Sequence, residues 1–197
     1  INSLGYSYDL IDDSDVSSTD FSQYVFVLVG DDDFSDVIVN QLAVEISENK
    51  ALILNSHHYY QSGSDWQWGF SRDKSAVSSP TGLKLSDELS SITDGVGETF
   101  NAYSGSDPDV KTYILKGQKP VGIELLVHKN GAQVSDTVVA IVEPGVKYLN
   151  GRTAQGRAVF IGFVESAFWS SESQEIFENA LVYMFEGEDR DDDGFFS

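Results

Sequence analysis

The stretch that decides the fold is Tyr24-Val25-Phe26-Val27-Leu28-Val29, an unbroken apolar run that ends at Gly30. A strand with one face in water alternates apolar and polar residues, whereas a strand that is buried on both faces is apolar throughout. The run therefore predicts a central strand of a parallel sheet.

The neighbouring segments fit such a sheet. Residues 37–48 carry apolar side chains at helical spacing, with Ser35 or Asp36 as the N-cap. Residues 51–54 form the next apolar run, and the alternation in residues 6–11 predicts a short strand ahead of the first. Strands and a helix in this order indicate a parallel sheet that is covered on both sides.

The rest of the chain predicts smaller elements and a hairpin. Residues 57–119 are rich in Ser, Gly and Asp, and residues 83–92 predict a short helix there. Asn130-Gly131 separates apolar runs at 121–128 and 136–142, which predicts a β-hairpin because both residues tolerate a positive φ. Further strands are expected at 147–149 and 158–163, and the last helix is expected at 172–185, capped by Ser171.

Composition argues against several classes of function. The chain has 12 basic and 32 acidic residues, a formal net charge of -20, and this charge repels nucleic acid and anionic membrane surfaces. There is no cysteine, which excludes disulfides and thiolate chemistry. No run approaches the roughly 20 apolar residues that span a bilayer, so we expect no membrane insertion.

Two parts of the sequence resemble a known family. Leu4-Gly5-Tyr6-Ser7-Tyr8-Asp9 leading to the run that ends at Gly30, and Gly156-Arg157-Ala158-Val159-Phe160-Ile161-Gly162-Phe163 leading to the last helix, are similar to class I glutamine-amidotransferase-like domains, including the trehalose-utilisation-type relatives. The resemblance implies an α/β fold with a three-layer, flavodoxin-like sheet, mostly parallel, with an antiparallel hairpin in the C-terminal third. Residues 1–186 would form this domain, and its first strand would precede Ile1.

The family's nucleophile is missing. Active relatives place a cysteine on a tight turn after the strand that matches residues 51–54. Here that turn reads Asn55-Ser56-His57-His58. A serine beside a histidine could replace the cysteine, but neighbouring residues at the end of a strand point to opposite sides, and a serine needs a separately placed base. We therefore expect no catalytic residues.

Asp31, His57 and His58 follow two predicted strands, at the edge where open α/β sheets bind ligands. They could bind a divalent cation or a sugar hydroxyl. The alternatives are a polar loop that caps the sheet and acidic residues that favour the start of a helix.

Trp66 and Trp68 lie close to this edge in the sequence, with Tyr59 and Tyr60. Aromatic rings of this kind can stack on sugar faces, which would make carbohydrate a partner. The same residues could instead form a small core beneath a long loop.

The acidic segment 187–197 contains Asp189, Asp191 and Asp193 at alternate positions, followed by Gly194. This spacing resembles the start of an EF-hand-like calcium loop, in which Phe195 would add its backbone carbonyl. The acidic residue expected at the twelfth position of such a loop is absent. The segment could therefore be a calcium site that residues outside this sequence complete, or an acidic linker.

These observations favour a non-catalytic interaction or structural module of a larger secreted or cell-surface protein, in which calcium binds at the Asp-rich segment. Its partners would be other domains or subunits of a surface assembly. The alternative is a hydrolase or carbohydrate-active domain that uses the Asp and His residues at the strand ends together with the loop aromatics.

Overall fold

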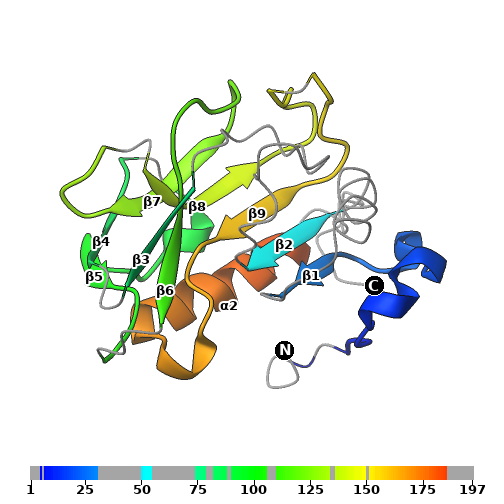
Figure 1. Ribbon diagram of the computed structural model, residues 1–197, viewed down its shortest axis with the longest axis horizontal. Helices are drawn as coiled ribbons and strands as arrows, with labels where there is room; N and C mark the ends of the chain where they lie inside the picture. The colour runs from blue at the N-terminus through cyan, green and yellow to red at the C-terminus, as the bar shows by residue number, and fades with distance from the viewer. Residues whose placement is uncertain are drawn as a thin grey trace, which may run out of the picture.

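The computed structural model describes residues 5, 7–30, 50–54, 74–78, 82–87, 90–105, 110–133, 136–149 and 151–185, with only the backbone described for Asp13, Ile53 and residues 74–78. These ranges contain one nine-stranded sheet (Figure 1). Its strands are β1 (Val27–Val29), β2 (Ala51–Leu54), β3 (Lys74–Ser78), β4 (Gly82–Leu85), β5 (Thr99–Asn101), β6 (Lys111–Leu115), β7 (Glu124–Lys129), β8 (Thr137–Val142) and β9 (Ala158–Ile161).

The parallel part of the sheet consists of β1, β2 and β9. Strand β2 lies in the middle, since Val27 pairs with Ala51 and Ala51 pairs with Ala158. Alternate side chains enter two hydrophobic clusters: Leu28 packs against one that contains helix residues, and Val29 belongs to the other. Both faces of these strands are therefore covered, which explains their continuous apolar sequence.

The larger part of the sheet is antiparallel. From β9 it continues through β8, β7 and β4 to β5, while β6 pairs with the start of β8 and β3 pairs with β6. Two strand pairs are parallel and six are antiparallel, so the expectation of a mostly parallel sheet is wrong for the described residues. Short connections between consecutive strands, such as the one between β7 and β8, favour antiparallel pairing, because a parallel pair needs a crossover of about a dozen residues or more.

The predicted hairpin is confirmed. Strands β7 and β8 are antiparallel neighbours, and Gly131 has a φ of +77°. The amide of Ala132 donates to the carbonyl of Lys129 at 3.1 Å and closes the turn. The amide of Lys129 donates to the carbonyl of Asp136 at 3.2 Å, so the connection is longer than a two-residue turn.

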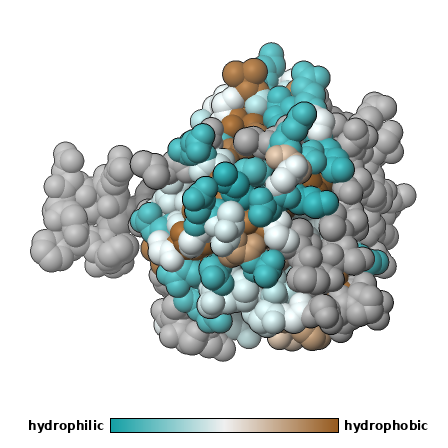
Figure 2. Space-filling model, turned by 90° about the vertical axis from the view of Figure 1, so that its left-hand side faces the viewer, coloured by the Kyte–Doolittle hydropathy of each residue, from teal (hydrophilic) through white to brown (hydrophobic). Residues whose placement is uncertain are grey.

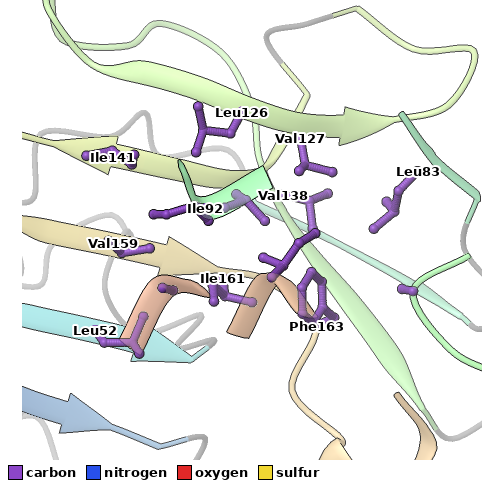
Figure 3. Packing of buried hydrophobic residues seen from close by; sticks show 14 of the residues in the cluster. Leu52, Leu83, Ile92, Leu126, Val127, Val138, Ile141, Val159, Ile161 and Phe163 are labelled. Atoms are coloured by element: carbon purple, nitrogen blue, oxygen red, sulfur yellow. The ribbon is translucent and has the colours of Figure 1, made fainter. Parts of the chain in front are cut away.

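The main helix, α2 (Ser171–Phe185), covers one face of the sheet (Figure 1). It confirms the predicted final helix, and its buried residues include Ile176, Leu181 and Met184. The N-cap is one residue earlier than predicted, because the Ser170 hydroxyl accepts a hydrogen bond from the amide of Ser173 at 3.1 Å. Figure 3 shows the cluster on this face, with Leu52, Val159 and Ile161 on neighbouring strands.

Short 3-10 helices make up much of the remaining cover. They are η2 (Asp13–Ser18), η3 (Phe21–Gln23), η5 (Ser91–Thr93) and η6 (Ser166–Phe168). Val16 and Phe21 from η2 and η3 belong to the cluster on the face opposite α2. With α2 and η5 on the first face, the parallel strands are covered on both sides.

Three predicted elements differ in the structure. Residues 83–92 contain the end of β4 and the 3-10 helix η5 rather than an α-helix, because Leu83 pairs with strands on both sides. Residues 147–149 form only an isolated bridge between Lys147 and Thr153. Residues 7–11 belong to no strand, although their alternation is typical of one. The predicted helix at 37–48 lies outside the described residues.

Candidate functional site

The candidate site is the edge of the sheet where the parallel strands end. The register places Val29 opposite Ile53 and Leu54 opposite Ile161, so β1, β2 and β9 all end at this edge. Open α/β sheets bind their ligands just beyond the carboxyl ends of such strands. Gly30 and Gly162 are the first residues beyond β1 and β9.

The predicted ligand-binding residues Asp31, His57, His58, Trp66 and Trp68 lie outside the described residues. The strands that precede them are described. Since β1 and β2 are parallel neighbours, the segments that carry the first three of these residues both leave the sheet from the same edge. The expected common origin of these segments is confirmed, and the expected ligand site remains a prediction.

The predicted calcium residues also lie outside the described ranges, namely Asp189, Asp191, Asp193 and Phe195. Within the described ranges no three His, Asp or Glu side chains converge in the manner of metal ligands. In the same part of the chain no helix has the length and hydropathy that a bilayer crossing needs.

Backbone from β6 closes the end of β9. The amide of Gly162 donates to the carbonyl of Val138 at 2.8 Å, and its carbonyl accepts from the amide of Tyr113 at 2.6 Å. A Cβ at position 162 would lie 2.0 Å from the carbonyl oxygen of Tyr113. Glycine is required here because the neighbouring backbone occupies the space of a side chain. The crossing strand therefore covers one of the three parallel strand ends.

Tyr103 holds the loop that follows β9 in place. Its hydroxyl donates to the carbonyl of Lys111 at 2.6 Å and accepts from the amide of Val164 at 3.1 Å. Burial raises the pKa of Tyr103 to about 12, an effect that the bond from Val164 partly opposes. The phenol is thus neutral at physiological pH and already bonded to two backbone groups. This arrangement fits a structural tie better than a general base.

Lys119 is an ionisable residue that the sequence analysis missed. Burial lowers the pKa of its ammonium to about 8, and the nearby Asp136 carboxylate partly opposes this. The ammonium donates to the carbonyls of Leu115 at 3.0 Å and Gly117 at 3.2 Å. Lysines with a lowered pKa occur at functional sites, but this one is held within its own loop. The sequence gives little sign that Lys119 is buried: the residue directly precedes Pro120, which the structure shows to be buried.

A second polar cluster lies at the opposite edge, where β9 begins. The Arg157 Nε lies 3.1 Å from the Glu143 carboxylate, and a terminal guanidinium nitrogen donates to the carbonyl of Tyr183 at 2.7 Å. The guanidinium also lies over the Tyr183 ring, 4.1 Å from its centroid. Burial, together with the hydrogen bond to Glu143, raises the pKa of the Tyr183 hydroxyl. The cluster joins the end of α2 to the sheet and lies away from the candidate site.

No known protein family and no curated protein sequence matches the chain. Several solved structures have a similar fold. A ThuA-like protein from Bacteroides uniformis has a TM-score of 0.57 at 12% identity, covering 87% of this chain and 74% of its own. A cytoplasmic protein from Salmonella typhimurium has a TM-score of 0.53 at 8% identity, with coverages of 85% and 74%.

A weaker likeness, with a TM-score of 0.44 at 15% identity, is to a GMP synthase component from Thermoplasma acidophilum, covering 87% of this chain and 77% of that one. Identities this low concern the fold and carry no function. The chain thus has an α/β fold of the flavodoxin-like kind that is also found in a ThuA-like protein.

Proposed function

We propose that this chain is a non-catalytic interaction or structural module of a larger secreted or cell-surface protein. The observation that carries the proposal is the closure of the β9 end by β6. Gly162 is held between the backbones of Tyr113 and Val138, so this part of the candidate site is filled by main chain. Open α/β sheets bind ligands just beyond the carboxyl ends of their strands, so main chain at the β9 end leaves less room there for a substrate.

The chain also has no cysteine at all. Active amidotransferase-like domains, which the sequence resembles, carry a nucleophilic cysteine on the tight turn after the strand that matches β2. Here Asn55-Ser56-His57-His58 follows Leu54. Two ionisable residues with shifted pKa values, Tyr103 and Lys119, make hydrogen bonds to backbone carbonyls and so have structural roles. These observations support a role in binding rather than in catalysis.

Calcium is part of the proposal on the strength of the sequence pattern Asp189, Asp191, Asp193 and Gly194, with Phe195 as a carbonyl donor. The test is isothermal titration of calcium chloride into the chain. We expect a dissociation constant of about 10⁻⁴ to 10⁻³ M, typical of extracellular modules. Replacing the three aspartates by asparagine should weaken binding about tenfold or more, because it removes the charged oxygens.

A charge-matched control is Asp87→Asn, Asp94→Asn and Glu98→Gln, which changes three exposed acidic residues. This variant should bind calcium like the unaltered chain. An unaltered chain that gives no heat, or two triple variants that behave alike, would remove calcium from the proposed function.

A hydrolase or carbohydrate-active domain is the second candidate. One observation favours it: β1 and β2 end side by side, so the segments that begin at Asp31 and Asn55 leave from one edge. Affinity electrophoresis in polysaccharide gels tests this reading. If migration is retarded, and if Trp66→Ala or Trp68→Ala abolishes the retardation, the carbohydrate reading replaces the first one.

A further inference from the structure

The charged residues of this chain are unevenly distributed. Residues 111–157 contain seven basic and three acidic residues, whereas the rest of the chain contains five basic and 29 acidic residues. Figure 2 shows one face of the molecule, on which the described surface is mostly hydrophilic with scattered apolar residues. Contacts with a surface of this kind depend on charge, so an acidic partner is attracted to the basic stretch.

One part of this stretch, residues 145–154, folds back on itself as a narrow hairpin, and all but one of its residues are described. The amide of Tyr148 donates to the carbonyl of Arg152 at 2.8 Å and joins the two arms. Tyr148 is 5% exposed and packs in the cluster on the face opposite α2, whereas Lys147 and Arg152 are exposed. In Figure 1 the yellow segment between β8 and β9 projects from the molecule. The 145–154 hairpin is therefore fixed to the core and carries two exposed basic side chains.

The last turn of α2 lies at the base of this hairpin. Glu143 is two residues before the hairpin, and Arg157 is three residues after it. The Tyr183 hydroxyl donates to the Glu143 carboxylate, and Arg157 donates to the Tyr183 carbonyl at 2.7 Å. Helix α2 ends two residues after Tyr183. The chain therefore leaves the helix next to the base of the hairpin.

The acidic segment 187–197 follows α2 almost directly. Asp193 is eight residues beyond Phe185, and extended chain of this length spans up to about 28 Å. Lys147 is four residues from Glu143 and Arg152 is five residues from Arg157, so both lie within about 18 Å of the base of the hairpin. The acidic segment can therefore reach both basic residues without any change in the sheet.

The covalent link between the acidic segment and the hairpin favours their contact. Ion pairs between exposed groups are individually weak. A short linker gives the two partners an effective concentration of roughly millimolar, which raises the population of a weak contact. A second copy of this chain has no such advantage in dilute solution, so the chain's own acidic segment is the favoured occupant.

We propose that the acidic segment 187–197 docks on Lys147 and Arg152 of the hairpin when calcium is absent, and that calcium releases it. The same carboxylates serve both contacts, and a bound Ca²⁺ adds two positive charges to the segment, which then no longer attracts basic side chains. Docking and calcium binding therefore weaken each other to the same degree. The inference deepens the proposed function and rests on it, since it names what calcium binding does.

Paramagnetic relaxation in NMR tests the docking directly. The chain has no cysteine, so Ser197→Cys accepts a nitroxide spin label at one position only. Without calcium, the label should broaden the amide signals of residues 145–154 and leave those of Asn130 and Gly131 sharp, because that turn lies at the other end of β8. Calcium chloride at saturating concentration should remove the broadening.

The matched variants each remove two positive charges. Lys147→Gln with Arg152→Gln should abolish the broadening and strengthen calcium binding about threefold, because the competing contact is lost. Lys111→Gln with Lys129→Gln changes residues near the start of β8, away from the hairpin, and should alter neither result. Thermal melts establish that both variants are folded.

Broadening that is uniform along the chain, or that persists in the variant of Lys147 and Arg152, would overturn the inference. Broadening that remains while calcium binds would do the same. A mixture of spin-labelled chain with isotope-enriched unlabelled chain should show no broadening, and broadening there would assign the contact to a second copy instead. Docking without any heat from calcium would remove calcium from the proposed function, whereas calcium binding without docking would remove only this inference.

Discussion

At one end of the sheet β5 presents Thr99 and Asn101 to solvent, whereas at the other end β1 presents a continuous apolar run. The antiparallel part between β8 and β5 is internally complete, with Leu126 and Ile141 fully buried. The parallel part is covered on both faces but has no strand beyond β1 among the described residues. The difference shows that the sequence of β5 is adapted to solvent at the end of the sheet, whereas the sequence of β1 is adapted to burial on both faces.

The largest expected effect is at the junction of the two parts. Gly162→Ala should destabilise the fold by about 3 kcal/mol or more, because the new methyl group would overlap the Tyr113 carbonyl and backbone cannot move aside as a flexible side chain can. Urea denaturation measures the loss. Gly105→Ala is the control, since nothing lies within 4 Å of the added carbon there. Equal stability of the two variants would show that β6 does not close the end of β9.

A matched pair of leucines compares the two parts directly. Leu126→Ala in β7 should cost about 3 kcal/mol, because the side chain is fully buried and the variant leaves a cavity. Leu28→Ala in β1 should cost about 1 kcal/mol, because that side chain is only half-buried and its site can relax. Denaturant midpoints of the two variants give the comparison. A larger loss at Leu28 would show that the parallel part contributes more to stability than the antiparallel part.

The buried phenol of Tyr103 predicts a pH dependence. Its folded pKa of about 12 exceeds the ordinary value of 10.0, so the unfolded chain ionises first. The stabilising contribution is therefore complete below about pH 10 and is lost as the pH rises toward about 12.

Tyr103→Phe should reduce this alkaline loss and should cost about 1–2 kcal/mol at neutral pH, where two backbone groups lose their partner. Denaturation at several pH values measures both effects, with Tyr8→Phe at an exposed position as the control. The steeper alkaline loss should persist in the control. An unchanged pH profile in Tyr103→Phe would mean that this hydroxyl is not buried.

The smallest effects are expected for charged pairs. Arg157→Met should cost about 1–2 kcal/mol, since Arg157 bonds both Glu143 and the Tyr183 carbonyl in a partly buried setting. Lys84→Met should cost less than about 0.5 kcal/mol, because its partner Glu98 is largely exposed. Thermal melts of the two variants test the difference. Similar melting temperatures would indicate that the cluster at the start of β9 adds no stability.

Much of the fold follows from local sequence signals. The apolar runs at β1, β2 and β9, the hairpin at Gly131 and the final helix each have the expected periodicity. The order of the antiparallel strands does not follow, because β3 to β6 are short and carry mixed residues. The pairing of β6 with Phe163 and Thr137 depends on contacts that are distant in sequence.

The candidate site was predictable only in part. The common edge of β1 and β2 follows from two parallel apolar runs. Closure of the β9 end depends on the backbone of Tyr113 approaching Gly162, and a single glycine in a sequence does not reveal such a contact. The lowered pKa of Lys119 arises from burial, which no local pattern in the sequence shows.

The most direct test of the central claim is amide hydrogen exchange at the junction of β6 and β9, measured by NMR. The amide of Gly162 donates to the Val138 carbonyl and the amide of Tyr113 donates to the Gly162 carbonyl, so both amides should exchange slowly, at rates set by global unfolding. Fast exchange at Gly162 and Tyr113 would contradict the closure of the β9 end by β6.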